Sequence, residues 1–165
     1  LFPYTTLFRS NCKRIACFAI TPQYISTIHG RVEGYREAMA AAGFKKRDEL
    51  LRVIHFEHIQ EDVEKYLLEF KVMTQVPDAI FALNNHIAMA LLKTLKLKEF
   101  VALSKIRVAC FDDLETFDII DKKVLSVAQP MEEIGKRSSE LIMDLVAGNA
   151  SGSTNIVLPT KLIVR

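Results

Sequence analysis

The stretch P-D-A-I-F-A-L-N-N, residues 77–85, decides the fold of this chain. Its middle, residues 79–83, is a short apolar run without polar alternation, which is typical of a strand buried on both faces of a parallel sheet. Two asparagines end the run, and apolar residues then recur at helical spacing over residues 86–97. The stretch therefore predicts a strand, a polar tip and a helix, and such a tip is where open α/β sheets bind their ligands.

The same pattern returns in residues 106–113, I-R-V-A-C-F-D-D, where the strand tip carries Asp112 and Asp113. Amides and carboxylates at neighbouring strand ends suit the hydroxyl or amide groups of a ligand. A phosphate would need a glycine-rich loop, and the six glycines are too scattered to form one. The two tips together predict a site for a ligand rich in hydroxyl or amide groups.

The remaining segments complete an alternation of strands and helices. Gly43 followed by Phe44 marks a helix end, because glycine readily adopts the left-handed turn. Four strand–helix repeats predict an α/β fold with a parallel sheet and helices on both faces. The predicted strands are residues 14–20, 51–56, 79–83, 106–113 and 124–127, with one or two more in 155–165; the predicted helices are about 27–42, 61–73, 86–97 and 131–146, with a single turn at 116–120.

Composition narrows the class of protein. A length of 165 residues suffices for one domain, and half of the residues are hydrophobic and a quarter charged, as in ordinary soluble proteins. A net charge of +2 argues against specific DNA binding by this chain alone. We expect no membrane contact, because no apolar run is long enough to span a bilayer and no signal-peptide pattern opens the chain. The three cysteines match no zinc or redox spacing, so we expect a cytoplasmic protein with neither metal nor cofactor.

The first ten residues, L-F-P-Y-T-T-L-F-R-S, do not fit the pattern that follows. They resemble a peptide that arises when sequencing-adapter DNA is translated onto the end of a truncated reading frame, so we exclude them from the fold prediction. The alternative is a genuine short edge strand.

Five motifs, taken in order, resemble the effector-binding region of the lactose-repressor (LacI/GalR) family of bacterial transcription regulators. Each motif alone is weak, but their order and spacing are specific, and the resemblance covers residues 14–165. The motifs are R-V-E-G-Y-R-E-A-M (31–39), P-D-A-I-F-A-L-N-N (77–85), V-A-C-F-D-D (108–113), S-V-A-Q-P (126–130) and L-P-T-K-L-I-V-R (158–165).

The resemblance implies one lobe of a two-lobed, periplasmic-binding-protein-like fold, in which two α/β lobes enclose a cleft behind a helix-turn-helix headpiece. The sequence is expected to begin after that headpiece and after most of the first lobe. Residues 1–10 would then be non-native and residues 11–165 the effector-binding domain. Within it, residues 11–127 and 158–165 would form the second lobe, and residues 128–157 would cross to the first.

The resemblance also implies which residues contact the effector. By motif position these are Arg31, Asn84, Asp112 and Gln129, and His58 is expected near the pocket because family members often carry an aromatic residue there. A guanidinium and a carboxylate on opposite sides of a small pocket would clamp vicinal hydroxyls. That chemistry suits a sugar or similar polyol, although relatives also bind nucleobases.

The chain departs from the family pattern at three places. Asn85 stands where the family usually has an aspartate, and Cys110 stands where it usually has a glycine, which would add a side chain close to the cleft. Lys122 and Lys123 replace prolines that are common before the last strand. The first two changes bear on the identity of the effector, and the third on a surface loop.

Simpler explanations exist for several of these residues. Asp112 and Asp113 are not expected to form a catalytic carboxylate pair, because adjacent residues at a strand end point to opposite sides. His55 and His58 lack a third metal ligand, so a surface position is favoured over a metal site. Arg31 has an alternative as an exposed helix charge, and Asn84 as a helix N-cap, which is compatible with ligand binding.

These observations predict a non-enzymatic ligand-sensing domain of a LacI-type regulator, which would meet DNA only through the absent headpiece. A homodimer is expected, with Ile119, Ile120 and Met89 at the interface, because consecutive apolar residues in a loop are seldom exposed in a monomer. The alternative is a periplasmic sugar-binding protein of a transport or chemosensory system. The sequence upstream would decide, because a regulator has a helix-turn-helix there and a periplasmic protein a signal peptide.

Overall fold

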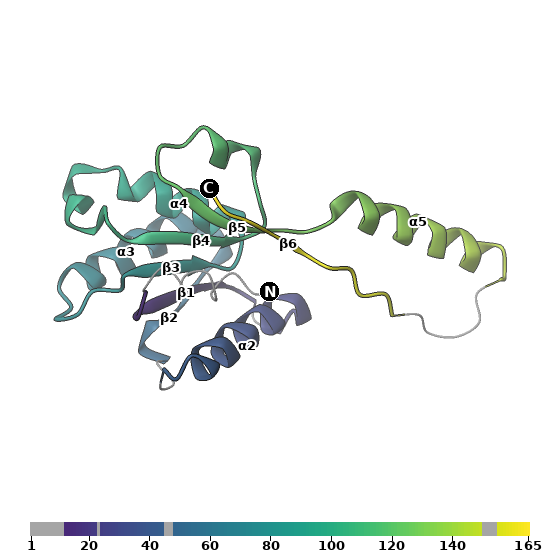
Figure 1. Cartoon of the computed structure of the whole chain (residues 1–165), viewed down its shortest axis with the longest axis horizontal. Helices are drawn as coiled ribbons and strands as arrows, with labels where there is room; N and C mark the ends of the chain where they lie inside the picture. Colours follow the sequence, from purple (N-terminus) through teal and green to yellow (C-terminus); the bar gives the residue numbers. More distant parts are fainter. Residues whose placement is uncertain (1–11, 23, 45–47, 150–154) are drawn as a thin grey trace.

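The computed structural model describes residues 12–22, 24–44, 48–149 and 155–165. Strands and α-helices alternate from β1 to β4, and only the short helix η4 separates β4 from β5 (Figure 1). In chain order, the elements are β1 (Ile15–Ile20), α2 (Ser26–Ala41), η1 (Asp48–Leu50), β2 (Leu51–Ile54), η2 (Phe56–His58), α3 (Ile59–Lys71), β3 (Ala79–Ala82), α4 (Asn85–Leu95), η3 (Lys98–Leu103), β4 (Arg107–Phe111), η4 (Glu115–Asp118), β5 (Val124–Ala128), α5 (Met131–Val146) and β6 (Lys161–Ile163).

The strands form one sheet in the order β2-β1-β3-β4-β5-β6. The first five are parallel, so the predicted parallel sheet is confirmed, and β6 adds an antiparallel edge through the pairing of Val127 with Leu162. From β1 the chain moves to one side for β2 and then to the other side for β3. The strand order therefore reverses between β1 and β3, and open α/β sheets bind ligands at the carboxyl ends of the strands beside such a switch point.

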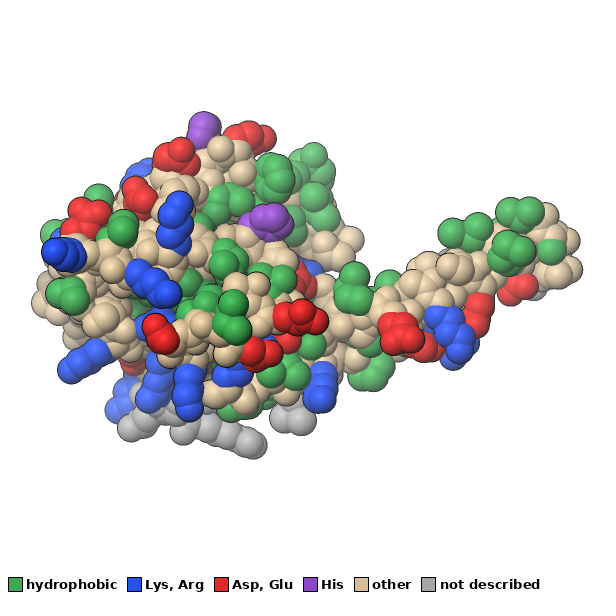
Figure 2. All heavy atoms as spheres, turned by 90° about the horizontal axis from the view of Figure 1, so that it is seen from above, with side chains coloured by type: hydrophobic (Ala, Val, Ile, Leu, Met, Phe, Trp, Pro, Cys, Tyr) green, Lys and Arg blue, Asp and Glu red, His purple; other side chains and the backbone are tan. Residues whose placement is uncertain are grey.

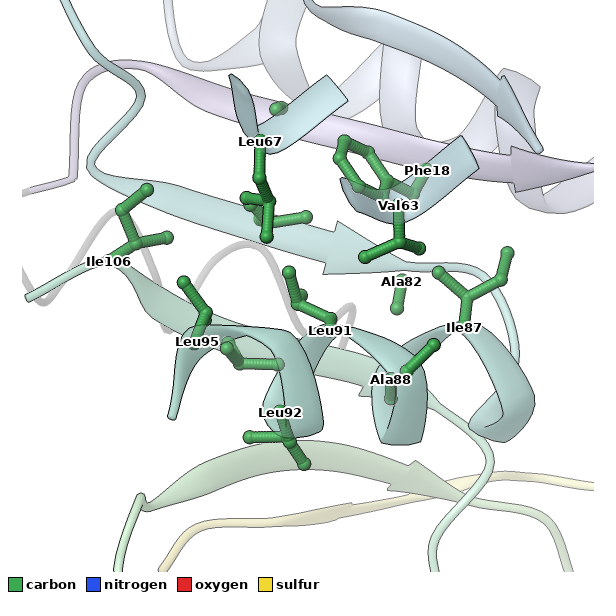
Figure 3. Packing of buried hydrophobic residues seen from close by; sticks show 14 of the residues in the cluster. Phe18, Val63, Leu67, Ala82, Ile87, Ala88, Leu91, Leu92, Leu95 and Ile106 are labelled. Atoms are coloured by element: carbon green, nitrogen blue, oxygen red, sulfur yellow. The ribbon is translucent and has the colours of Figure 1, made fainter. Parts of the chain in front are cut away.

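Helices cover both faces of the sheet, as predicted (Figure 1). Helix α2 packs on one face, where Val32, Tyr35 and Met39 join a buried cluster with alternate residues of β1 and β3. Helices α3 and α4 pack on the other face (Figure 3), where Leu67 and Leu91 belong to a second buried cluster. Because both faces are covered, β1 and β3 are wholly buried, which explains their uninterrupted apolar sequences.

The predicted helix end at Gly43 is confirmed. Gly43 has a φ of +79°, and its amide donates to the Ala40 carbonyl oxygen at 2.9 Å, while the Phe44 amide donates to Met39 at 2.9 Å. A residue with a Cβ would be strained at that φ, so glycine is needed to end α2 here.

Helix α5 projects away from the sheet (Figure 1). None of its residues is buried, although Met143, Leu145 and Val146 are apolar and each is more than 60% exposed. Figure 2 shows hydrophobic side chains on one edge of this projecting segment and charged ones along the other. Among the described residues, no helix combines the length and apolar character needed to cross a membrane.

The predicted boundaries differ from the structure mainly at element ends. The α3 helix begins at Ile59 rather than 61, and the predicted turn at 116–120 is the short helix η4 (Glu115–Asp118). The first ten residues lie outside the described part of the chain, so the prediction that they are non-native stays a prediction.

Candidate ligand-binding site

The candidate site is built on the tip of β4, where Asp112 has an unusual backbone. Its φ is +79°, in the left-handed region that residues other than glycine, asparagine and aspartate rarely adopt. Such a conformation costs on the order of 1–2 kcal/mol, so the surroundings must hold it. One of these contacts is the Asp112 amide, which donates to the Val127 carbonyl oxygen on β5 at 3.0 Å.

The Asp112 carboxylate is engaged on both oxygens. Gln129 Nε2, which follows β5, donates to Oδ1 at 2.5 Å, and Arg31 Nη1 donates to Oδ2 at 3.4 Å. The Arg31 and Asp112 side chains are 17% and 24% exposed, so the pair is partly shielded yet open to a ligand. The three residues come from α2, β4 and the end of β5 and meet at the carboxyl edge of the sheet.

Arg31 is held in place by three contacts. Its Nη1 also donates to the Leu83 carbonyl oxygen at the end of β3, at 2.7 Å, and its Cζ lies 3.9 Å from the centre of the Phe111 ring. Cation–π contact with a partly buried ring adds attraction and fixes the plane of the guanidinium. The alternative in which Arg31 is an exposed helix charge is therefore wrong.

The sequence predicted Arg31 and Asp112 on opposite sides of a small pocket, and this detail is also wrong. The long Arg31 side chain reaches from α2 across the strand tips and touches Asp112 directly. In this structure the two charges neutralise each other. The hydroxyl groups of a bound ligand would replace part of this contact.

The two asparagines of the β3 tip serve different purposes. Asn84 is the N-cap of α4, and its Oδ1 accepts a hydrogen bond from the Ile87 amide at 2.9 Å. Within the described residues its side-chain amide nitrogen has no protein partner and can donate to a ligand. Asn85 lines a cavity of about 330 Å³ together with Asp112, Asp113, Ala128, Gln129 and Met131.

Of the predicted contact residues, His58 stands apart. It is exposed at the end of η2, beyond the outer strand β2, and no side-chain contact joins it to Arg31, Asp112 or Gln129 in the described part of the chain. Two other aromatic residues follow strands at this edge of the sheet: Phe56, after β2, is 60% exposed, and Tyr24, after β1, is 88% exposed.

No metal site forms around these histidines. His55 Nδ1 instead pairs with Asp62 Oδ2 at 2.8 Å, and the described residues contain no cluster of three metal-ligating side chains. Partial burial acts to raise the pKa of Asp62, but the backbone and side-chain hydrogen bonds and the charge of His55 outweigh it, so the pKa lies below its usual value.

The Asp113 carboxylate has other partners than the Asp112 carboxylate, although both residues line the cavity of about 330 Å³. Asp113 accepts hydrogen bonds from Ser126 and from Arg165, whereas Asp112 binds Arg31 and Gln129. Burial acts to raise the pKa of Asp113, but the hydrogen bonds from Arg165 and Ser126 hold the pKa below its usual value. Because the two carboxylates diverge, they do not flank a common bond, which a glycosidase mechanism would require.

Cys110 does not contribute to the cleft, contrary to the expectation from the sequence. It is fully buried in the core cluster shared with α3 and α4, and its Sγ donates to the Phe111 carbonyl oxygen at 3.0 Å. Burial raises the pKa of its thiol far above the usual value, so the group stays neutral. The side chain points into the core because alternate residues of β4 face opposite sides of the sheet.

A second hollow lies on the α4 side of the sheet. It has a volume of about 580 Å³ and is mostly apolar, and Met89 and Ile120 contribute to its walls. Ile119, which was predicted beside them, is 84% exposed and does not line it. We call this hollow the α4 groove; its lining residues are Ile59, Gln60, His86, Met89, Ala90, Leu92, Lys93, Lys96, Thr116 and Ile120.

The fold and the site define a class of protein: a periplasmic-binding-protein-like lobe with a polar site at its switch point. The sequence matches the family described as "Periplasmic binding protein-like domain" over residues 4–165. The chain therefore belongs to this family.

Known relatives place the chain near LacI-type transcription regulators. It is 25% identical over 159 residues to the transcriptional repressor CytR of Escherichia coli (strain K12), and 26% identical over 159 residues to the transcriptional regulator CelR of Thermobifida fusca. Each match covers 96% of this chain and 46% of the relative, so the chain spans about half the length of these curated relatives.

Solved structures give the same result. A CelR–cellobiose complex superposes with a TM-score of 0.81 at 28% identity, covering 97% of this chain and 48% of that one. A LacI-family regulatory protein from Chloroflexus aggregans superposes with a TM-score of 0.83 at 24% identity, covering 98% and 57%, and this second likeness supports the fold alone.

Proposed function

We propose that this chain is the ligand-sensing domain of a LacI-type transcription regulator and that it binds a sugar or similar polyol at the carboxyl edge of its sheet. The observation that carries the proposal is the hydrogen-bonded set Arg31–Asp112–Gln129 beside the β1/β3 switch point. The named relatives are regulators, which supports a binding role rather than an enzymatic one and favours a regulator over a periplasmic binding protein.

The chemistry of the set suits neighbouring hydroxyl groups. Asp112 accepts hydrogen bonds, Arg31 donates several from a rigid plane, and the free amide of Asn84 adds a donor. Because Arg31 and Asp112 neutralise each other, the set favours a neutral ligand over an anion. The exposed rings of Phe56 and Tyr24 offer apolar surfaces at the same edge, suited to the face of a sugar ring or of a nucleobase.

A complete pocket needs a second lobe. We infer that residues 128–157 cross to that lobe, because α5 buries none of its residues and carries an exposed apolar edge. A further hollow of about 390 Å³ between α5 and the returning segment, lined by Ile134, Leu141 and Ile156, is open to receive it. Closure of the two lobes on a ligand would then move a DNA-binding headpiece, which would belong to another part of the protein.

The α4 groove is proposed as the contact with a second copy of the protein. It is apolar, and the exposed Ile119 beside it extends the apolar surface. Such a homodimer agrees with the dimer that the resemblance to LacI-type regulators implies. DNA would be bound only by the paired headpieces. We propose a cytoplasmic location on the same grounds.

A ligand screen on the complete protein tests the proposal. We expect one or a few neutral sugars, with cellobiose among those tested, to raise the melting temperature saturably and to bind in titration calorimetry. Arg31→Met should abolish this response, while Lys65→Met, a change of an exposed cation on α3, should not. Binding of anionic metabolites only, or binding unaffected by Arg31→Met, would contradict the proposed site.

A further inference from the structure

Arg165 joins three parts of the lobe. Its guanidinium donates two hydrogen bonds to the Asp113 carboxylate, from Nη1 to Oδ1 at 2.9 Å and from Nη2 to Oδ2 at 3.2 Å. Its Nε donates to Asp118 Oδ1 in η4 at 2.5 Å, and Nη1 also donates to Ser126 Oγ on β5 at 2.9 Å. The Arg165 side chain is only 13% exposed, so these contacts are largely shielded from water.

These contacts fix the residue that follows Asp112. Asp113 receives donors from Arg165 and from Ser126, so its position against β5 is set from two directions. The left-handed φ of Asp112 turns the chain between the two aspartates, and this turn sends their side chains to opposite sides. A bidentate pair between arginine and a carboxylate is geometrically specific, which makes it suited to hold a strained turn.

We propose that Arg165 is a positioning residue for the ligand site: by holding Asp113 against β5 and η4, it keeps the Asp112 carboxylate directed at Arg31 and Gln129. The inference rests on the proposed function only in treating Asp112 as a ligand anchor. The positioning itself is a property of the ligand-free protein, and it can be measured without any ligand.

The same residue ties the site to the α4 groove. Asp118 belongs to η4, and Thr116 of that short helix and Ile120 just beyond it line the groove. Loosening Arg165 should therefore loosen both the β4 tip and η4, whereas the interior of β3 has no contact with it and should stay unchanged.

The test compares Arg165→Met and Arg165→Lys in the complete, ligand-free protein by NMR and amide hydrogen exchange. Met keeps the aliphatic stem and removes every donor, while Lys keeps one charged contact. Arg137→Met is the matched control, because Arg137 also binds two carboxylates, those of Glu133 and Glu140, but on α5.

We expect at least tenfold faster exchange of the amides of residues 112–118 in Arg165→Met, an intermediate change in Arg165→Lys and none in the control. The side-chain amide protons of Gln129, which report its bond to Asp112 on the far side of the tip, should lose protection in the same order. A role limited to anchoring the β6 edge would leave Gln129 unaffected. The β3 amides serve as the internal reference.

Unchanged Gln129 protection in a folded Arg165→Met variant would overturn the inference. So would loss of the fold in both Arg165 variants, because a positioning residue is not needed for the sheet to form. If the protein binds no sugar but shows the expected exchange pattern, the proposed function fails and the positioning role stands.

Discussion

Asp112 and Asp113 are neighbours in the chain, yet their carboxylates bind partners on opposite sides of the β4 tip. The Asp112 carboxylate accepts hydrogen bonds from Arg31 and Gln129. The Asp113 carboxylate accepts them from Arg165 and Ser126. The left-handed backbone of Asp112 separates them. One aspartate is therefore available to a ligand, and the other secures the framework that presents it.

The left-handed backbone at Asp112 predicts a difference in stability between two substitutions at this position. Asp112→Gly should unfold with a free energy roughly 1 kcal/mol higher than Asp112→Ala, because glycine adopts a φ of +79° without the Cβ penalty. Both variants should lose ligand binding, since both lack the carboxylate. Chemical denaturation of the two variants measures the difference, and equal stabilities would show that Asp112 is not strained.

Part of this arrangement could be predicted from the sequence. The apolar runs before Asn84 and Asp112 predicted two strands. The divergence of the two aspartates was expected from strand alternation, but both lie beyond β4, and the left-handed backbone of Asp112 separates them. Gly43 was likewise predictable, since a left-handed helix end favours glycine. The short terminal strand β6 was foreseen, but its antiparallel direction has no local signal.

Other features depend on long side chains and distant contacts. The direct pairing of Arg31 with Asp112 depends on how far an arginine on α2 reaches, which spacing along the chain does not reveal. The role of Arg165 depends on the returning strand β6, which brings this residue back to Asp113 across 52 positions of the chain. Cys110 was assigned to the cleft by its nearness to the tip, but its register on β4 directs it into the core.

The pairing of His55 with Asp62 predicts a defined acid response. The lowered pKa of Asp62 in the folded protein means that its stabilising effect is full above the unfolded pKa of about 3.9 and is lost as the pH falls through the lower folded value. The stability difference between the native protein and Asp62→Asn should therefore shrink as the pH falls from about 5 through the folded pKa of Asp62. Asp144→Asn, an exposed change on α5, is the control. A pH-independent difference would contradict the pairing.

The α4 groove predicts the site of self-association. Met89→Asp combined with Ile120→Asp should convert the complete protein from dimer to monomer in sedimentation, because two charges would enter an apolar contact. Val72→Asp, at a position that is 85% exposed beyond α3, is the control and should leave the dimer intact. A dimer that survives the double substitution would place the interface elsewhere.

When this 165-residue chain is studied alone, we expect the backbone amides of helix α5 to exchange with solvent faster than those of any other α-helix in the described part of the chain. None of its residues is buried, whereas β3 is fully buried, so amide exchange in α5 should be fast and exchange in β3 slow. In the complete protein, α5 should gain protection from the second lobe. Similar exchange of α5 in both forms would mean that residues 128–157 do not cross to another lobe.

The central claim, that ligand binding depends on Asp112, is tested most directly by titration calorimetry of a sugar identified in the screen. The protein is compared with its Asp112→Asn and Asp113→Asn variants. Asp112→Asn replaces one acceptor with a donor facing ligand hydroxyls, which should cost about 2–3 kcal/mol, or a loss of roughly thirty- to a hundredfold in affinity. Asp113→Asn keeps one acceptor for Arg165 and loses the second, so it should weaken binding less than Asp112→Asn does. If Asp113→Asn abolished binding while Asp112→Asn did not, the assignment of the β4 tip to the ligand would be contradicted.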